Sequence, residues 1–445
     1  MARVLIVGGS DAGISAALRA RELDPTVEVT VVLADRYPNF SICGLPYFLS
    51  GDVPDWRSLA HRRVEDLERA GIELLMERRV ERVDAASHTL VIRDSLHRYD
   101  RLVIATGAEP IRPPIPGLEH RGVHQLHTVD DARLLEGLLE REPERAVIVG
   151  AGYIGLEMAE ALRARDVEVV VVEQLPAVLP TVDRELGELV RQELERKGVL
   201  VLSDSTVTAI ERNGARLAVA GDGLSEEADI VLVVVGVRPS VDLGRAAGIP
   251  LGPRGALQVD RHMRTALPDV FAAGDCTVTY HRLLEADTYL PLGTTAHKQG
   301  RVAGENAVGG ERRYEGSLGT QVVKVFELAV ARTGLRDAEA AEAGLVPLTD
   351  QTVGYDHKVY YPDAHEVAVR LTGERSSGRL LGAQMLGHLG AQIAKRIDIV
   401  ATALYSGLSV DAVNDLDLSY TPPFGSPWDV AQAAAQAWTL QQTAM

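Results

Sequence analysis

The chain has 445 residues, of which 46% are hydrophobic and 24% charged, and its formal net charge is −17. This length exceeds what one ordinary core holds, so we expect several domains, and the composition is that of a soluble globular protein with no apolar run long enough to cross a membrane. The acidic balance argues against nucleic acid and membrane surfaces as partners, because both are anionic.

The cysteines and the N-terminal residues indicate the cellular compartment in which we expect the protein. Cys43 and Cys276 are the only cysteines, too few for a disulfide framework or a Cys-rich zinc site, and we expect no metal ion. The apolar block at residues 4–8 is too short for a signal peptide. We therefore expect a cytoplasmic protein.

The first 20 residues have the pattern of a dinucleotide-binding turn. An apolar strand at residues 3–7 leads into a turn that contains Gly8 and Gly13, and a helix follows from Ile14. Glycines let the backbone approach a pyrophosphate, which then lies on the helix N-terminus. Ser10 occupies the middle glycine position, so this turn alone is a weak signal.

The second strand, residues 27–32, lacks the acid that usually holds an adenosine ribose in such folds. It ends in Leu33. Two alternatives remain open: Asp35, two positions later, binds the ribose, or backbone groups do.

A short stretch around Cys43 follows, at residues 39–47. Gly44 and Pro46 make it a tight segment that can present a thiol to a ligand. We expect a helix over residues 58–69 and strands over 72–83. A buried strand then ends in Thr106-Gly107, and a proline cluster at residues 110–116 marks a linker.

Beyond this linker the pattern begins again, now complete. The motif Gly-x-Gly-x-x-Gly comprises Gly150, Gly152 and Gly155, and it lies between an apolar strand and a helix. The next strand, 167–172, ends in Glu173, which lies 23 residues (173 − 150) after Gly150. A carboxylate there accepts hydrogen bonds from ribose hydroxyls and repels a 2′-phosphate, so we predict that NADH is preferred to NADPH.

The second half of the chain adds one more cofactor signal. Residues 269–276 form an apolar strand that ends in Gly274-Asp275, an arrangement that suits hydrogen bonding to cofactor hydroxyls. Helices are expected over 183–197, 296–306 and 391–405. The last quarter has no phosphate turn and reads as an α+β oligomerisation module.

Two dinucleotide turns in one chain indicate two dinucleotides side by side, one reducing the other.

These motifs together resemble the flavin-dependent pyridine nucleotide–disulfide oxidoreductases. The single cysteine narrows the resemblance to the branch with coenzyme A-disulfide reductases, NADH oxidases, NADH peroxidases and persulfide reductases. The diagnostic segments are the first glycine turn, Cys43–Tyr47, Ala105–Gly107, Gly150–Glu157, Gly274-Asp275 and Tyr420–Pro423.

The resemblance implies an α/β fold with two Rossmann-like domains and a C-terminal α+β dimerisation domain. It divides the chain into an FAD domain at 1–112, an NAD domain at 113–240, a second FAD segment at 241–318 and a dimerisation domain at 319–445. It implies a homodimer in which the partner subunit completes each active site.

The same resemblance assigns the site residues. The catalytic residues it implies are Cys43, Tyr361 and Tyr420, the two tyrosines reaching the cysteine of the partner subunit. The residues it places at the FAD are Gly8, Gly13, Asp35, Thr106, Gly107, Gly274 and Asp275. Those at the NADH are Gly150, Gly152, Tyr153, Gly155, Glu157, Glu173 and Gly236, with Tyr153 gating the flavin face. Residues compatible with a substrate channel are Ser15, Arg19, Asn39 and His297.

The implied function is an NADH-dependent reductase that passes hydride through FAD to Cys43 and on to a small disulfide, persulfide or polysulfide. Two alternatives stay open: an NADH oxidase that reduces oxygen, and a flavoprotein that donates electrons to a protein partner. The tyrosine pair and Asp11, where the oxidases usually carry histidine, favour a sulfur substrate. The coenzyme A enzymes usually have an arginine, a polar residue and a lysine where this chain has Glu22, Ile42 and Trp428, so coenzyme A remains an open question.

Overall fold

The structure, a computed structural model, describes residues 2–444. They form two compact units. The first combines the residues up to Ile111 with 127–136 and 236–317, and the second combines 112–126, 137–235 and the chain from Leu318 on.

A five-stranded parallel sheet organises the first unit. Its order is β18-β7-β1-β2-β3, and all four strand pairs are parallel. The strands are β1 (Arg3–Val7), β2 (Glu28–Val32), β3 (Ile72–Leu75), β7 (Arg101–Ile104) and β18 (Val270–Ala272). In such a sheet the carboxyl ends of the strands form one edge, where ligands bind. The first glycine turn and Gly274-Asp275 both follow strands at this edge.

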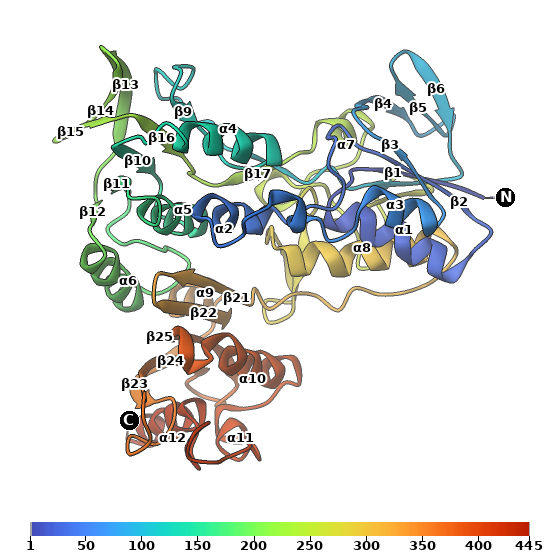
Figure 1. The fold of residues 1–445 in the computed structure, drawn as a ribbon. Helices are drawn as coiled ribbons and strands as arrows, with labels where there is room; N and C mark the ends of the chain where they lie inside the picture. The colour runs from blue at the N-terminus through green and yellow to red at the C-terminus, as the bar shows by residue number, and fades with distance from the viewer. Residues whose placement is uncertain (1, 445) are drawn as a thin grey trace. The chain divides into compact units, whose positions relative to one another are not determined.

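Two helices run side by side along this sheet, α1 (Asp11–Leu23) and α8 (Gly293–Ala307) (Figure 1). Their packing is close because α8 presents glycines to α1. A Cβ at Gly300 would overlap the carbonyl of Ala12, and one at Gly304 would overlap that of Ala16. The contact therefore brings polar side chains at the rim of the two helices within bonding distance.

The segment between β2 and β3 corrects one expectation. Residues 58–69 are not one helix: a 3₁₀ turn, η2 (Trp56–Leu59), is separated from α3 (Val64–Arg69). The reason is that residues 59–61 pair with the segment before Cys43, since Ser41 N donates to Leu59 O and His61 N donates to Asn39 O, both at 2.9 Å. The other elements here are η1 (Ile42–Gly44) and α2 (Leu45–Ser50).

The first unit is completed by small antiparallel sheets and two short helical segments. They are β4 (Val80–Asp84), β5 (Thr89–Ile92), β6 (Ser95–Arg98), β8 (Ala108–Pro110), β17 (Val237–Pro239), α7 (Asp242–Ala246), η3 (Pro253–Gly255), β19 (Thr279–His281) and β20 (Ala286–Thr288). Strand β8 pairs with β17, which joins the two points where the chain leaves and re-enters this unit.

The second unit contains another parallel sheet, in the order β12-β11-β10-β16-β9. Its strands are β9 (Val123–His124), β10 (Arg145–Val149), β11 (Glu168–Val172), β12 (Val199–Leu202) and β16 (Ile230–Val233). The associated elements are α4 (Val129–Leu139), whose first part belongs to the first unit, α5 (Tyr153–Arg163), α6 (Arg184–Arg196), β13 (Val207–Asn213), β14 (Arg216–Gly221) and β15 (Leu224–Ala228).

An antiparallel sheet with helices forms the C-terminal part of the second unit, in the order β21-β22-β25-β24-β23. Its elements are β21 (Gln321–Val325), β22 (Leu328–Gly334), α9 (Asp337–Glu342), β23 (Pro347–Tyr355), β24 (Glu366–Glu374), β25 (Leu380–His388), η4 (Leu389–Ala391), α10 (Ile393–Tyr405), α11 (Val410–Asn414) and α12 (Val430–Thr443). The predicted fold class, two Rossmann-like sheets plus an α+β C-terminal domain, is confirmed.

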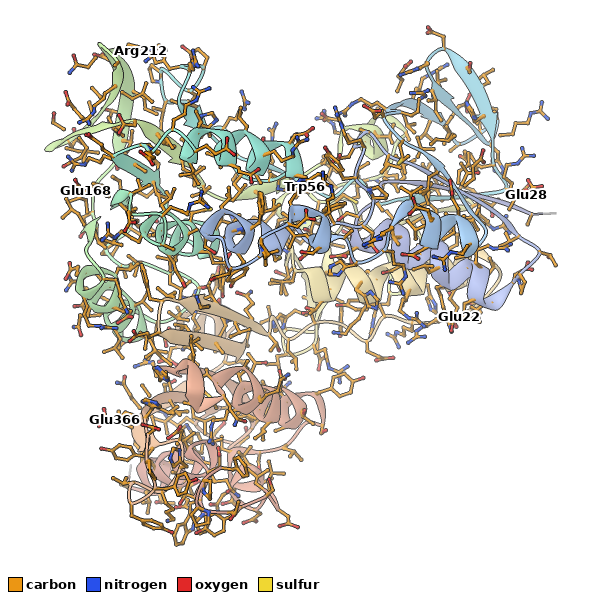
Figure 2. All side chains as sticks on the ribbon, in the orientation of Figure 1. Glu22, Glu28, Trp56, Glu168, Arg212 and Glu366 are labelled. Atoms are coloured by element: carbon orange, nitrogen blue, oxygen red, sulfur yellow. The ribbon has the colours of Figure 1, made fainter. Side chains whose placement is uncertain are left out.

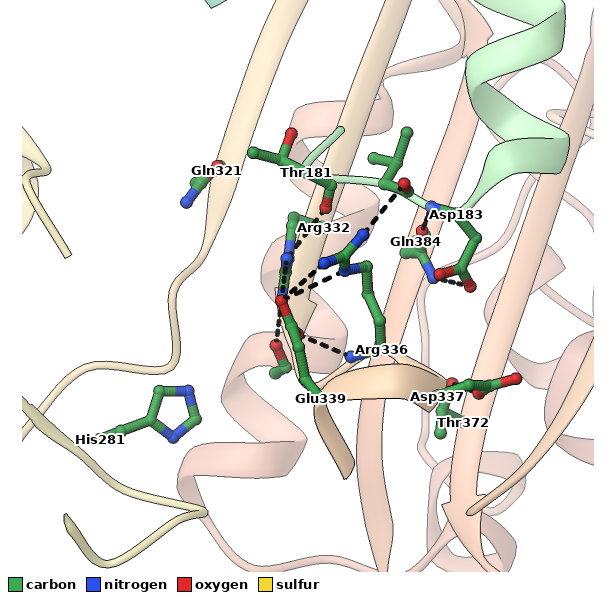
Figure 3. Close-up of polar contacts among 12 residues, drawn as sticks. Thr181, Asp183, His281, Gln321, Arg332, Arg336, Asp337, Glu339, Thr372 and Gln384 are labelled. Carbon is green, nitrogen blue, oxygen red and sulfur yellow. Dashed lines mark hydrogen bonds and ion pairs between the residues drawn. The ribbon is translucent and has the colours of Figure 1, made fainter. Parts of the chain in front are cut away.

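Buried polar contacts fasten the C-terminal sheet to the segment before α6 (Figure 3). Arg332 is 8% exposed and donates to the Thr181 carbonyl at 2.9 Å and to Glu339 at 2.6 Å. Asp183 accepts from Gln384 at 2.6 Å. The hydrogen bonds of Arg332 and Gln384 thus connect the C-terminal sheet with the segment before α6, and both parts belong to the second unit.

Among residues 2–444, no helix combines the length and the apolar character needed to cross a membrane.

Candidate functional site: two dinucleotide turns and a cysteine

The first glycine turn brings backbone to backbone where side chains would not fit. Gly8 has φ +120°, and a Cβ there would overlap the carbonyl oxygen of Ala105. A Cβ on Gly13 would overlap the carbonyl oxygen of Gly8. The first-turn N–H groups of α1 face this turn, which is the arrangement that binds a pyrophosphate. The turn therefore fits a dinucleotide.

The carboxyl group of Asp275 has one oxygen atom whose surroundings test whether a cofactor fits here. Its Oδ1 atom is buried and has no hydrogen-bond partner. Burial and the nearby charge of Asp11 raise the pKa of its carboxyl to about 6. A buried carboxylate oxygen without a donor costs free energy unless a ligand supplies one. Hydroxyl groups of a cofactor such as FAD fit this position.

The residues after β2 show why the ribose acid is absent. Leu33 is 3% exposed and lies against Gly9, so it fills the space beside the turn with apolar atoms. Asp35 is exposed, and its Oδ1 accepts from the N–H groups of Arg36 at 2.6 Å and Tyr37 at 3.1 Å. Asp35 thus caps its own turn, and the structure leaves its predicted contact with FAD untested.

Thr106 and Gly107 follow β7, near the points where the chain leaves and re-enters the first unit. Thr106 Oγ1 donates to the Ser240 carbonyl at 2.6 Å, and Ser240 N donates to the Gly107 carbonyl at 2.9 Å. Nothing lies within 4 Å of a Cβ built on Gly107. Hydrogen bonds with Ser240 therefore hold this turn, and the space beside the Gly107 Cα is open.

The two cysteines differ in environment. Cys43 is exposed on η1, directly before α2. Cys276 is 0% exposed, and its Sγ lies 3.4 Å from the Ala273 carbonyl oxygen, so burial raises the pKa of its thiol. Since the thiolate is the reactive form, Cys276 serves packing and Cys43 is the thiol available to a reactant.

Three of the four predicted substrate residues lie along the α1–α8 rim. Ser15 Oγ is 2.9 Å from His297 Nδ1, and burial followed by the charge of Arg301 lowers the pKa of His297. Arg19 donates twice to Glu305, at 2.9 and 2.7 Å, and lies 2.9 Å from Glu22.

The surroundings of Glu22 differ from those that the sequence suggests. Its carboxylate lies between Arg19 and Arg301, the latter at 3.4 Å, so it is part of an ion-pair row. Asn39, the fourth predicted substrate residue, is 5% exposed and lies beside the glycine turn, with its N–H donating to the Gly9 carbonyl at 2.8 Å.

The second glycine turn has the same construction in the second unit. Gly150 has φ +109°, a Cβ on Gly155 would overlap the Gly150 carbonyl oxygen, and Gly152 precedes α5 with open space around it. Glu173 is 7% exposed. Its carboxylate accepts from Ala151 N at 2.8 Å and from Leu175 N at 2.9 Å. The acid at the end of β11 is therefore fixed beside the turn, with lone pairs remaining for ribose hydroxyls.

Tyr153 begins α5 directly after this turn. Its hydroxyl donates to Gln321 and accepts from Thr181 Oγ1 at 3.1 Å. Glu157 lies one turn further along the same helix. Gly236 begins the return of the chain to the first unit, where its carbonyl accepts from Ile111 N at 2.9 Å.

The two predicted tyrosines lie on exposed loops of the C-terminal part. Tyr361 is 43% exposed and packs edge-on against His357, with ring centroids 5.7 Å apart. Tyr420 is 44% exposed and hydrogen-bonds with the side chain of Tyr360. Within this chain, Tyr360 is therefore the neighbour of Tyr420, and the predicted roles of Tyr361 and Tyr420 at the cysteine of the partner subunit stay predictions.

A fold with two parallel sheets, a dinucleotide turn at each and an exposed thiol in the first unit defines a class: oxidoreductases that use two dinucleotide cofactors. The comparisons with known proteins agree. Residues 2–300 match the family model described as pyridine nucleotide-disulphide oxidoreductase, and residues 320–431 match the dimerisation domain of that family.

The chain therefore belongs to the pyridine nucleotide-disulphide oxidoreductase family, whose cofactors are FAD and NAD(H), and its dimerisation domain implies a homodimer. It is 32% identical to an NADH oxidase of Methanocaldococcus jannaschii over 98% of both chains. It is 32% identical to an NAD(P)H sulfur oxidoreductase (CoA-dependent) of Pyrococcus furiosus over 96% of this chain and 97% of that one. Among solved structures, an NAD-dependent persulfide reductase from A. fulgidus is 36% identical with a TM-score of 0.96, covering 99% of this chain and 84% of the other.

Proposed function

We propose that the protein is an NADH-dependent flavoprotein reductase that reduces a small disulfide, persulfide or polysulfide at Cys43. The observation that carries this proposal is the exposed Cys43 on a tight turn of the unit with the FAD-type glycine turn. A sulfur oxidoreductase and an NADH oxidase are both among the relatives. The tyrosine pair favours a sulfur substrate, because the reduction of oxygen alone does not require Tyr361 and Tyr420.

NADH binding falls to the second unit. The turn of Gly150, Gly152 and Gly155 takes the pyrophosphate, and Glu173 accepts the ribose hydroxyls. Glu157 and Tyr153 lie on the helix that starts at this turn. Gly236, where the chain returns to the first unit, is the last proposed NADH contact.

FAD binding falls to the first unit, with Gly8 and Gly13 at the pyrophosphate and Asp275 at hydroxyl groups, while Thr106, Gly107 and Gly274 leave backbone exposed to it. When bound, FAD accepts hydride from NADH and supplies an electron pair to sulfur.

The sulfur chemistry at Cys43 balances with one NADH and one proton. The Cys43 thiolate attacks one sulfur of a disulfide RSSR, the S–S bond breaks, and the leaving thiolate takes a proton to become RSH. An electron pair and a second proton then cleave the mixed disulfide on Cys43, which releases the second RSH and restores the thiolate. A persulfide substrate gives RSH and hydrogen sulfide by the same steps.

The dimer supplies the remaining groups. We propose that Tyr361 and Tyr420 of one subunit donate hydrogen bonds to the reacting sulfur atoms at Cys43 of the other. Ser15, Arg19, Asn39 and His297 line the approach of the substrate. A reaction that needs a free thiolate suits the reducing cytoplasm.

A substrate panel tests the proposal. NADH consumption is followed without oxygen in the presence of cystine, glutathione disulfide, coenzyme A disulfide or polysulfide, and in parallel with oxygen alone. We expect turnover of at least one sulfur compound to exceed oxygen reduction by at least about tenfold in kcat/KM. Fast oxygen reduction with no sulfur turnover would instead identify an NADH oxidase.

A further inference from the structure

Side chains from three separate segments meet beside the first glycine turn, in a cluster that neither the sequence motifs nor the family comparison assigns. Its members are Tyr37, Phe40, Trp56, Arg57 and Arg133, which we call the Trp56 cluster; Trp56 is labelled in Figure 2. The rings of Tyr37, Phe40 and Trp56 lie 5.2 to 5.6 Å apart. Arg57 and Arg133 lie 5.0 and 5.4 Å from the centre of the Trp56 ring.

We propose that Tyr37, Trp56 and Arg133 form a clamp that retains the adenosine and phosphate end of FAD, in place of the carboxylate that is missing at position 33. This inference concerns how the cofactor is held and does not depend on which sulfur compound the enzyme reduces.

The position of the cluster supports this assignment. In folds of this kind the adenosine ribose lies at the end of the second strand, beside the glycine turn. Here β2 is followed by Leu33, and the segment that comes next curves around the turn until Asn39 N donates to the Gly9 carbonyl at 2.8 Å. Tyr37 is carried on this segment. Tyr37 therefore brings the clamp to the end of β2, the place where this kind of fold binds an adenosine ribose.

The chemistry of the cluster also fits that ligand. Aromatic rings stack on an adenine, and a guanidinium binds phosphate oxygens or ribose hydroxyls. Arg133 is exposed and uses one N–H to donate to the Tyr37 hydroxyl at 3.3 Å, and a guanidinium has further N–H donors for a ligand. The rings hold this arginine in place, which reduces the entropy lost when it binds a ligand.

Asp35 does not compensate for Leu33 in this arrangement. Its Oδ1 already accepts two N–H groups of its own turn. Although the residue is exposed, partial desolvation of its carboxyl raises the pKa, and the charge of Asp130 adds to that effect. An arginine and two rings are therefore better placed than this carboxyl to hold the nucleotide.

The test is cofactor affinity measured on apoprotein. FAD is removed from the dimer, and FAD and FMN are titrated back separately with flavin fluorescence as the signal. FMN lacks the adenylate half, so a clamp on that half predicts a specific pattern. Arg133→Ala, Arg133→Gln and Trp56→Leu should each raise the Kd for FAD about tenfold, the size expected for loss of a partly desolvated cation contact, and should leave the Kd for FMN unchanged.

The matched control is Arg98→Ala, an exposed arginine on β6 of the same unit, which should change neither Kd. Circular dichroism melting of each apoprotein checks folding, and Arg133→Gln keeps the size of the side chain if Trp56→Leu does not fold. Unchanged FAD affinity in both Arg133 variants would overturn the clamp. Equal weakening of FAD and FMN would also overturn it, because that result means that the scaffold and not the adenylate contact was lost.

Discussion

Asp275 is the residue whose surroundings say most about cofactor binding. Its Oδ1 has no partner within the described chain, and burial, with the charge of Asp11, raises its pKa to about 6. A folded-state pKa above the usual 3.8 means that the folded apoprotein binds a proton more tightly than the unfolded chain does. The stability of the apoprotein should therefore fall as the pH rises from about 4 to about 6.

This shift predicts the pH dependence of FAD binding. Cofactor hydroxyls donate to the ionised carboxylate, so the affinity of the apoprotein for FAD should rise as the pH rises through about 6 and then level off. Asp275→Asn keeps the shape and removes the titration, so its FAD affinity should be weaker and flat across this range. Titrations of FAD into both apoproteins between pH 5 and pH 8 measure this, and an equally steep rise in the variant would assign the dependence to another group.

At the scale of single elements, the end of β11 sets the nucleotide preference. Glu173 is fixed beside the second glycine turn by the N–H groups of Ala151 and Leu175, and Gln174 offers no cation. A 2′-phosphate would meet a buried carboxylate, so we expect kcat/KM for NADH to exceed that for NADPH by at least about tenfold.

A paired substitution tests this preference. Glu173→Ala combined with Gln174→Arg removes the repulsion and adds a phosphate ligand, so it should move the ratio toward NADPH by about 100-fold. Gln192→Arg, on α6 of the same unit, is a control that adds one positive charge elsewhere and should leave the ratio unchanged. A wild-type enzyme that already prefers NADPH would refute the assignment of Glu173.

At the scale of the whole molecule, we predict that each active site of the dimer contains residues of both subunits. Cys43→Ser and the double variant Tyr361→Phe/Tyr420→Phe each lack one half of the proposed site. If the halves come from different subunits, a mixed dimer of these two chains contains one intact site, and a statistical mixture should regain about a quarter of wild-type activity. Purified mixed dimers with no more activity than their parents would place the tyrosines at the cysteine of their own chain.

The sequence predicts the local parts of this molecule well and the distant pairings poorly. The glycine turns follow from a few adjacent residues whose backbone has no room for a Cβ, and strand 167–172 appears as β11 (Glu168–Val172). The helix over 58–69 was wrong because residues 59–61 pair with residues 39–41, a tertiary contact without a local pattern.

The same limit applies to the candidate site. Leu33 is visible in the sequence as a missing acid, but the Trp56 cluster joins segments that are far apart in the chain, so no spacing rule finds it. Glu22 looks from sequence like a lone carboxylate that repels phosphate, and only the packing of α1 on α8 places it between Arg19 and Arg301.

The most direct test of the central claim is a two-step anaerobic stopped-flow measurement on Cys43→Ser. The first step mixes enzyme with one equivalent of NADH, and the flavin should be reduced at the wild-type rate, because the variant keeps both dinucleotide turns. The second step adds the best sulfur substrate from the panel, and the return of flavin absorbance should be fast in the wild type and in Cys276→Ala but slower by at least about 100-fold in Cys43→Ser. Reoxidation of Cys43→Ser by that substrate at the wild-type rate would contradict the account.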